Sequence, residues 1–202
     1  MFCLLKRKKG VGRVCERLPA AFADEAGEAA LELCGPGAGE SGWHGACLAA
    51  AELARRGLLR PARLSAALPA LLEALRFDAV LAARVAGPAV RDAACYAFWV
   101  RKKENKRKRI FRQSKKAMAR AYGREVLIGF AASLGAGLLE CAALDREPNC
   151  RRAASAALQE HIGRAALFEH GLQLVQITDY FRLASVKVAY LEVAPEITVF
   201  PE

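Results

Sequence analysis

The sequence has few aromatic residues and no long uncharged run. Aromatic residues make up 7% of its 202 residues, which is low for a protein built from β-sheets. The longest uncharged run, residues 126–139, has 14 residues, whereas a membrane-spanning helix needs about 20. We therefore expect a buried helix there and no membrane span. Residues 1–5 are apolar but too short for a signal peptide, and KRKK follows them directly.

Common catalytic and metal-binding patterns are also absent. The sequence has no G-x-S-x-G, H-E-x-x-H or G-x-x-x-x-G-K-[ST] motif, and the glycine-rich stretch 129–137 has no phosphate-binding lysine. Its seven cysteines include no C-x-x-C pair, and its three histidines do not supply clustered zinc ligands. We interpret the cysteines as small buried residues in a reducing compartment. The sequence therefore predicts a non-catalytic protein without cofactor or metal.

Most of the net positive charge comes from one segment. The formal net charge is +10, but residues 101–116, RKKENKRKRIFRQSKK, contain ten basic residues and one acidic residue. The rest of the chain has 21 basic and 20 acidic residues, which argues against a nucleic-acid-binding fold. Two interpretations of the segment stay open. It is either a solvated loop or charged helix extension, or a signal for nuclear import or for binding phosphate backbones or acidic tails.

What the sequence has in abundance is alanine, with 42 residues, arranged in a weak internal repeat. Similar small-residue segments begin at residues 44, 91, 151 and, less clearly, 186, so their spacings are 47, 60 and 35. Without the 16-residue basic segment, the spacing of 60 becomes 44. Helix pairs repeating at this period are typical of HEAT or armadillo repeats. We predict an all-α HEAT/armadillo-type solenoid of about four helix pairs, with exposed hydrophobic faces at both ends.

Partner helices are expected between the repeat segments. They cover residues 20–34, a helix opened by Pro61 with leucines at helical spacing, and residues 125–143. Residues 35–39, GPGAG, break the chain between helices, and Asp145 is a candidate cap for the helix that contains Arg151. No segment is a convincing strand, because Pro195 argues against one in the alternating stretch 184–200.

Collinear segments of the chain resemble the tubulin-folding cofactor D family. The resemblance covers nearly the whole chain except residues 101–116, and it is carried by KGVGR (9–13), RLP (17–19), WHGACLA (43–49), AELARRGLL (51–59), VRDAACY (90–96), DR (145–146), NCRRAASAALQE (149–160), GR (163–164), DYF (179–181), YLEVAP (190–195) and FPE (200–202).

The resemblance implies a cytoplasmic, cytoskeleton-associated solenoid that binds β-tubulin during folding and heterodimer assembly after the chaperonin. It also implies partnership with tubulin-folding cofactors C and E in stimulating GTP hydrolysis by tubulin, and regulation by an Arf-like small GTPase. Family members are several times longer, so we expect residues 1–202 to be one fragment of the solenoid. Residues 101–116 interrupt a family segment and would be an inserted segment, and Val186 stands where the family commonly has Arg. A HEAT-type adaptor that binds nucleic acid or import factors through this insertion is the alternative.

Basic residues that recur with the repeat are the candidate contacts to acidic tubulin: Arg55, Arg56, Arg91, Arg151 and Arg152. Arg55 and Arg56 end a helix, so we expect them to be the least buried of the five. The structural alternative is that Arg91, Arg151 and Arg152 begin helices and pair with an Asp of the neighbouring turn. Each exposed contact would contribute roughly 0.2–1 kcal/mol and would weaken with salt.

Overall fold

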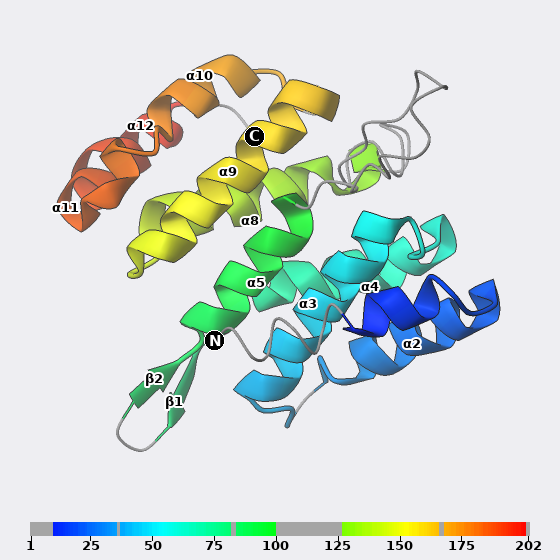
Figure 1. The fold of residues 1–202 in the computed structure, drawn as a ribbon. Helices are drawn as coiled ribbons and strands as arrows, with labels where there is room; N and C mark the ends of the chain where they lie inside the picture. Colours follow the sequence, from blue (N-terminus) through cyan, green and yellow to red (C-terminus); the bar gives the residue numbers. More distant parts are fainter. Residues whose placement is uncertain (1–9, 36, 82–83, 100–126, 166–167, 201–202) are drawn as a thin grey trace.

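Helices stack in two layers in the computed structural model, which describes residues 10–35, 37–81, 84–99, 127–165 and 168–200. The first layer contains α2 (Ala20–Glu32), α4 (Leu64–Ala74) and α8 (Ala131–Leu144). The second contains α3 (Glu40–Arg56), α5 (Pro88–Trp99) and α9 (Pro148–Ala165). Each second-layer helix packs on the helix that precedes it in its pair, and α5 also packs between α3 and α9. This arrangement is the predicted solenoid (Figure 1).

The fourth pair is made of shorter pieces. The helix α10 (Gly171–Ile177) packs on α9, and η3 (Arg182–Ala184), α11 (Val186–Val188), the π-helical turn η4 (Ala189–Val193) and α12 (Ala194–Ile197) follow. Because η4 and α12 contact α8, this group continues the stack. The stretch that contains Pro195 is therefore helical, which confirms the prediction that no strand forms there.

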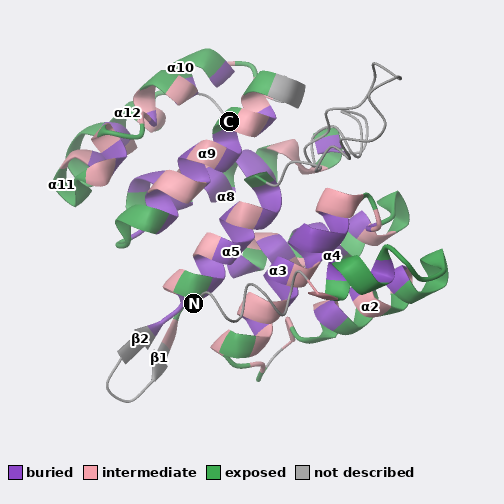
Figure 2. Cartoon of the chain, in the orientation of Figure 1, coloured by how far each residue is buried: buried purple, intermediate pink, exposed green. Residues whose placement is uncertain are grey.

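The repeat segments lie where the sequence analysis placed them. Residues 44–50 are in α3, residues 91–97 in α5, and residues 151–158 in α9. Alanines of these helices, such as Ala51, Ala94 and Ala154, have no exposed surface, because small side chains let neighbouring helices approach closely. Figure 2 shows buried residues running along the second-layer helices α3, α5 and α9, where they pack between neighbours.

The partner helices also agree with the predictions. The expected helix 20–34 is α2, Pro61 opens a 3₁₀ turn (η1, Pro61–Arg63) before α4, and the expected helix 125–143 corresponds to η2 (Ile128–Phe130) followed by α8. Leu134 and Leu138 of α8 are buried, as expected for the uncharged run. None of the helices in the described part combines the length and apolar character that crossing a bilayer requires.

A short β-hairpin between α4 and α5 was not predicted. Strands β1 (Ala79–Leu81) and β2 (Arg84–Ala86) pair antiparallel and project from the stack (Figure 1). Gly87 joins the hairpin to α5 with φ of 138°, a backbone conformation that residues with a Cβ rarely adopt. A Cβ at this position would lie 2.5 Å from the Phe77 carbonyl oxygen. The sequence analysis was wrong here, because three-residue strands are too short to show a period.

Candidate interaction surface

Arg55 and Arg56, at the end of α3, are held by acidic residues of the chain itself. Arg55 donates from Nε and Nη2 to the two carboxylate oxygens of Glu52, at 3.1 and 2.5 Å. Arg56 pairs with Glu16 and lies 3.6 Å from Glu52. The Arg55 and Arg56 side chains are 14% and 11% exposed, so both are less buried than Arg91 and Arg151, as expected, although acidic partners cover most of their surface. Their role in partner contact stays a prediction.

Arg91 and Asp145 form an ion pair between α5 and the turn before α9. Arg91 donates from Nε and Nη2 to Asp145 at 2.6 and 3.2 Å, and from Nη1 to the Phe77 carbonyl at 2.9 Å. Burial disfavours the charged guanidinium, but the hydrogen bond and charge of Asp145 outweigh it, so the pKa of Arg91 lies above its usual value. The alternative that Arg91 pairs with a neighbouring Asp is confirmed.

Asp145 also organises the start of α9. Its Oδ1 accepts a hydrogen bond from the backbone amide of Glu147 at 2.8 Å, just before the first helical residue. The predicted cap thus acts one step earlier than expected, because Asp145 bonds the amide of the residue before α9 and not an amide of its first turn, and the same carboxylate also binds Arg91. One side chain thus fixes both the entry of α9 and its position against α5.

Within the described part of the chain, Arg151 binds backbone carbonyls and no carboxylate. Its guanidinium donates to the carbonyls of Asp145 (2.8 Å), Arg146 (3.0 Å), Leu183 (2.7 Å) and Ala184 (3.0 Å). The residue is 1% exposed, and these bonds connect α9 to the turn before it and to η3. The prediction of an Asp partner was wrong for Arg151, because the planar fork of five donors satisfies several carbonyls at once.

Arg152 points elsewhere, with its guanidinium carbon 4.4 Å from the centre of the Tyr180 ring. This cation–π contact links α9 to the segment between α10 and η3. The structure therefore does not bring the five candidate arginines onto one surface. Arg91, Arg151 and Arg152 each connect successive parts of the stack. Arg55 pairs with Glu52 of the same helix, and Arg56 pairs with Glu16.

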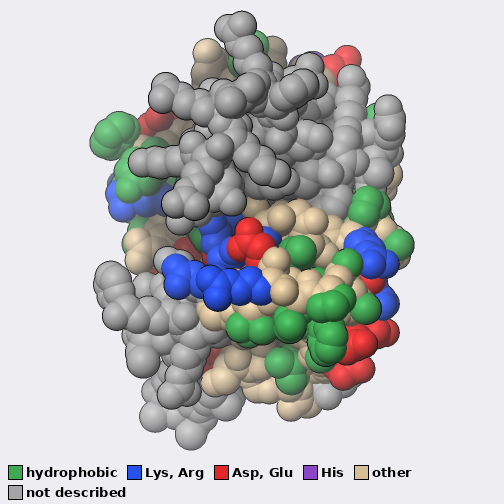
Figure 3. Space-filling model, turned by 45° about the vertical axis from the view of Figure 1, so that its right-hand side comes forward, with side chains coloured by type: hydrophobic (Ala, Val, Ile, Leu, Met, Phe, Trp, Pro, Cys, Tyr) green, Lys and Arg blue, Asp and Glu red, His purple; other side chains and the backbone are tan. Residues whose placement is uncertain are grey.

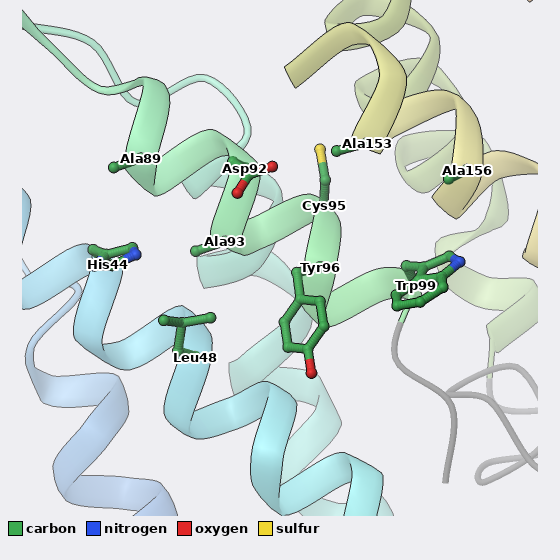
Figure 4. Close-up of a pocket in the computed structure, with 10 residues that line it drawn as sticks. All are labelled: His44, Leu48, Ala89, Asp92, Ala93, Cys95, Tyr96, Trp99, Ala153 and Ala156. Atoms are coloured by element: carbon green, nitrogen blue, oxygen red, sulfur yellow. The ribbon is translucent and has the colours of Figure 1, made fainter. Parts of the chain in front are cut away.

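A groove of about 480 Å³ crosses the second layer of helices. In Figure 4, α5 forms its floor, with α3 on one side and α9 on the other. The lining is mainly apolar and includes Leu48 from α3, Ala93, Tyr96 and Trp99 from α5, and Ala153 and Ala156 from α9. Alanines line the groove because their short side chains leave the space open. Sequence reasoning assigned these alanines to helix packing alone and missed the groove.

Asp92 supplies the carboxylate of this groove. Burial raises the pKa of Asp92, and no described residue forms an ion pair with it. Its neighbour Arg91 is turned away toward Asp145. The pKa of Tyr96 is raised by burial and by Glu52 and lowered by Arg55, so one end of the groove lies near the Arg55–Glu52 pair. The arrangement can bind an apolar group together with a cation.

The thiols of the described residues behave as packing groups. Cys15, Cys47, Cys95, Cys141 and Cys150 are buried, and the Sγ atoms of Cys95 and Cys141 are 3.9 Å apart. The hydrogen bond to Cys141 and burial raise the pKa of Cys95, and burial raises that of Cys150, which keeps both thiols protonated. No group of three or more His, Cys, Asp or Glu among the described residues has the geometry of a metal site.

Large hydrophobic side chains are exposed at both ends of the stack, as the sequence analysis expected. Near α2, Val14 is 55% and Leu33 50% exposed, and Figure 3 shows hydrophobic side chains gathered on this side of the molecule. At the other end, Leu172 is 78% exposed, and Phe181 and Val199 are each 81% exposed. Such faces are typical of solenoid ends that lack a polar cap.

Comparisons with known proteins agree with the fold. The family model described as "Tubulin-specific chaperone D-like, ARM repeats" matches residues 6–172. The chain is 35% identical over 183 residues to tubulin-specific chaperone D of Dictyostelium discoideum, covering 88% of the chain and 11% of that protein. It is 28% identical over 208 residues to tubulin-folding cofactor D of Schizosaccharomyces pombe, covering 96% of the chain and 17% of that protein. No solved structure matches the chain.

The chain thus spans less than a fifth of the length of these curated relatives. The family model covers the pairs α2–α3, α4–α5 and α8–α9, which include every helix that lines the groove. Armadillo repeats are also the architecture that the alanine-rich segments predicted. On these grounds the chain belongs to the tubulin-specific chaperone D-like family of ARM-repeat proteins.

Proposed function

We propose that this chain acts in tubulin folding as a non-catalytic scaffold. It binds β-tubulin after release from the chaperonin and contributes to assembly of the αβ-heterodimer in the cytoplasm, associated with the cytoskeleton. The observation that carries the proposal is the family match over residues 6–172, supported by two relatives named as a tubulin-specific chaperone and a tubulin-folding cofactor. The extended second-layer surface of α3, α5 and α9 is of the kind that solenoids use for protein partners.

The finer part of the proposal concerns partners. Together with tubulin-folding cofactors C and E, the chain contributes to stimulation of GTP hydrolysis by tubulin, and an Arf-like small GTPase regulates it. Because the activator function belongs to an assembly, the chain alone is expected to leave tubulin GTP hydrolysis unchanged. A rise in hydrolysis is expected when the chain is added to tubulin with cofactors C and E. Measuring phosphate release with each component omitted in turn tests this.

A second candidate function rests on the basic composition of residues 101–116, which lie outside the described residues. Through this segment the chain would act as an adaptor for nucleic acid or import factors. A pull-down with purified tubulin, small GTPases and an RNA oligonucleotide separates the two functions when the full chain is compared with a deletion of 101–116. If the deletion keeps tubulin binding and loses RNA binding, the segment has a separate activity. If the full chain fails to bind tubulin at physiological salt, the folding role is wrong.

A further inference from the structure

The groove over α5 is shared by three successive repeats. Leu48 on α3, Tyr96 and Trp99 on α5, and Ala156 on α9 come from segments of the chain more than 100 residues apart, yet they line one continuous surface (Figure 4). The rings of Tyr96 and Trp99 lie 6.1 Å apart, and Trp99 is 38% exposed. An apolar side chain placed here would contact both rings and the aliphatic wall. The groove therefore suits a segment of a protein that lies across the second-layer helices.

Asp92 gives this groove a defined charge. Its carboxylate lies among mainly apolar groups, which partly remove it from water. Holding the charge there costs free energy unless a cation or hydrogen-bond donors compensate it. The nearest arginine in sequence, Arg91, is committed to Asp145 and the Phe77 carbonyl. Among the described residues nothing else neutralises Asp92. A lysine or arginine beside an apolar side chain would complement this groove in both charge and polarity.

We propose that this groove docks a segment of β-tubulin that presents a lysine or arginine to Asp92 and an apolar side chain to Leu48, Tyr96 and Trp99. The inference rests on the proposed function and deepens it by naming the contact site. It also reverses the expected charges. The arginines that the sequence analysis selected are engaged within the chain, whereas the carboxylate of Asp92 is not paired with any described cation.

The test measures binding of the full chain to purified αβ-tubulin by biolayer interferometry at several salt concentrations. Asp92→Asn keeps the size of the side chain and removes its charge. We expect it to weaken binding about tenfold and to flatten the salt dependence. Trp99→Ala, at a partly exposed position, is expected to weaken binding by a similar factor through lost apolar contact.

Glu25→Gln is the matched control, because it removes one negative charge from an exposed position on α2, away from the groove. We expect it to bind like the unchanged chain. Urea unfolding distinguishes docking from a structural role. If Asp92 serves docking, Asp92→Asn leaves stability unchanged or raises it while binding falls, since the charge of a half-buried, desolvated carboxylate has been removed.

The outcomes separate the two proposals. If the unchanged chain binds tubulin and Asp92→Asn and Trp99→Ala bind as tightly as Glu25→Gln, the groove is not the contact site and the folding role stands. If the unchanged chain does not bind tubulin, both proposals are overturned. If the two groove variants alter self-association in analytical ultracentrifugation but leave tubulin binding intact, the groove holds a second copy of the chain and the β-tubulin assignment is wrong.

Discussion

Breaking the ion pair between Arg91 and Asp145 should strongly destabilise the fold. Only 7% of the Arg91 side chain and 3% of the Asp145 side chain are exposed, and their closest atoms are 2.6 Å apart. Replacing Arg91 by Met leaves a buried carboxylate whose remaining donor is the Glu147 amide, with the Cys141 thiol at 3.7 Å. The loss of one partner of a buried pair typically costs about 3–5 kcal/mol in free energy of unfolding. We expect Arg91→Met to fall in this range.

The two partners are not equivalent. After Asp145→Ala, the guanidinium of Arg91 still donates to the Phe77 carbonyl and has Asp78 at 3.8 Å, so part of its charge is compensated. Asp145→Ala also removes the acceptor for Glu147 at the start of α9. Each single variant therefore loses more than the pair alone, and the double variant Arg91→Met with Asp145→Ala should be less destabilised than the sum of the two.

A matched exposed pair supplies the control. Arg76 and Glu140 approach to 2.7 Å, but their side chains are 62% and 46% exposed. Removing either one should change the free energy of unfolding by about 0–1 kcal/mol, because water compensates exposed charges. Urea unfolding followed by far-UV circular dichroism measures the unchanged chain and, for each pair, both single variants and the double variant, and it gives the coupling energy of each pair. If Arg91→Met costs no more than Arg76→Met, burial does not set the strength of this pair and the reasoning is refuted.

Three further predictions use the same unfolding measurement. Arg151→Lys should cost about 3 kcal/mol or more, because one ammonium cannot replace a fork that donates to four carbonyls, and a cost under about 1 kcal/mol would contradict that role. Burial lowers the pKa of His161 from 6.5 to about 4 in the folded chain. As the pH falls, the unfolded chain therefore takes up this proton before the folded chain does. The contribution of His161 to the free energy of unfolding is complete above about pH 6.5 and is lost as the pH falls toward 4. The loss is about 3 kcal/mol, and a His161→Phe variant should not show this part of the pH slope. Gly87→Ala should lower the free energy of unfolding by more than about 1 kcal/mol. Gly129→Ala is the control and should lower it by less, because a Cβ at Gly129 would meet nothing within 4 Å. Equal losses for the two variants would exclude backbone strain at Gly87.

The helical architecture was predictable because its signal is spread over many residues. Alanine-rich segments at a regular spacing mark α3, α5 and α9, and leucines at helical spacing mark α4, where Leu64, Leu68 and Leu71 are all buried. A single residue that departs from such a pattern does not obscure it. The hairpin before Gly87 is formed by only a few residues, so the sequence contains no comparable pattern that would predict it.

The arrangement of charges was harder to predict, for two different reasons. Glu52 lies three and four residues before Arg55 and Arg56 on the same helix, so this pairing could have been read from the sequence. The acceptors of Arg151 could not, because the carbonyls of Leu183 and Ala184 approach it only after η3 has packed against α9. A carbonyl is also present at every residue, so the sequence does not indicate which ones a guanidinium will bind.

The buried arginines determine how the groove is built. Arg91 ties α5 to the turn before α9, and Arg151 ties α9 to the following repeat, so both fix the position of α9 beside α5. The groove lies between α3 and α9 over α5, and its width therefore depends on contacts made by residues that do not line it. Arg91 and Asp92 are adjacent in sequence on α5, but Arg91 binds Asp145 whereas Asp92 lines the groove. One charge holds the repeats together, and the other lines the groove. We therefore expect a change at Arg91 that preserves folding to alter the shape of the groove, and with it the proposed docking, without removing any of the lining residues.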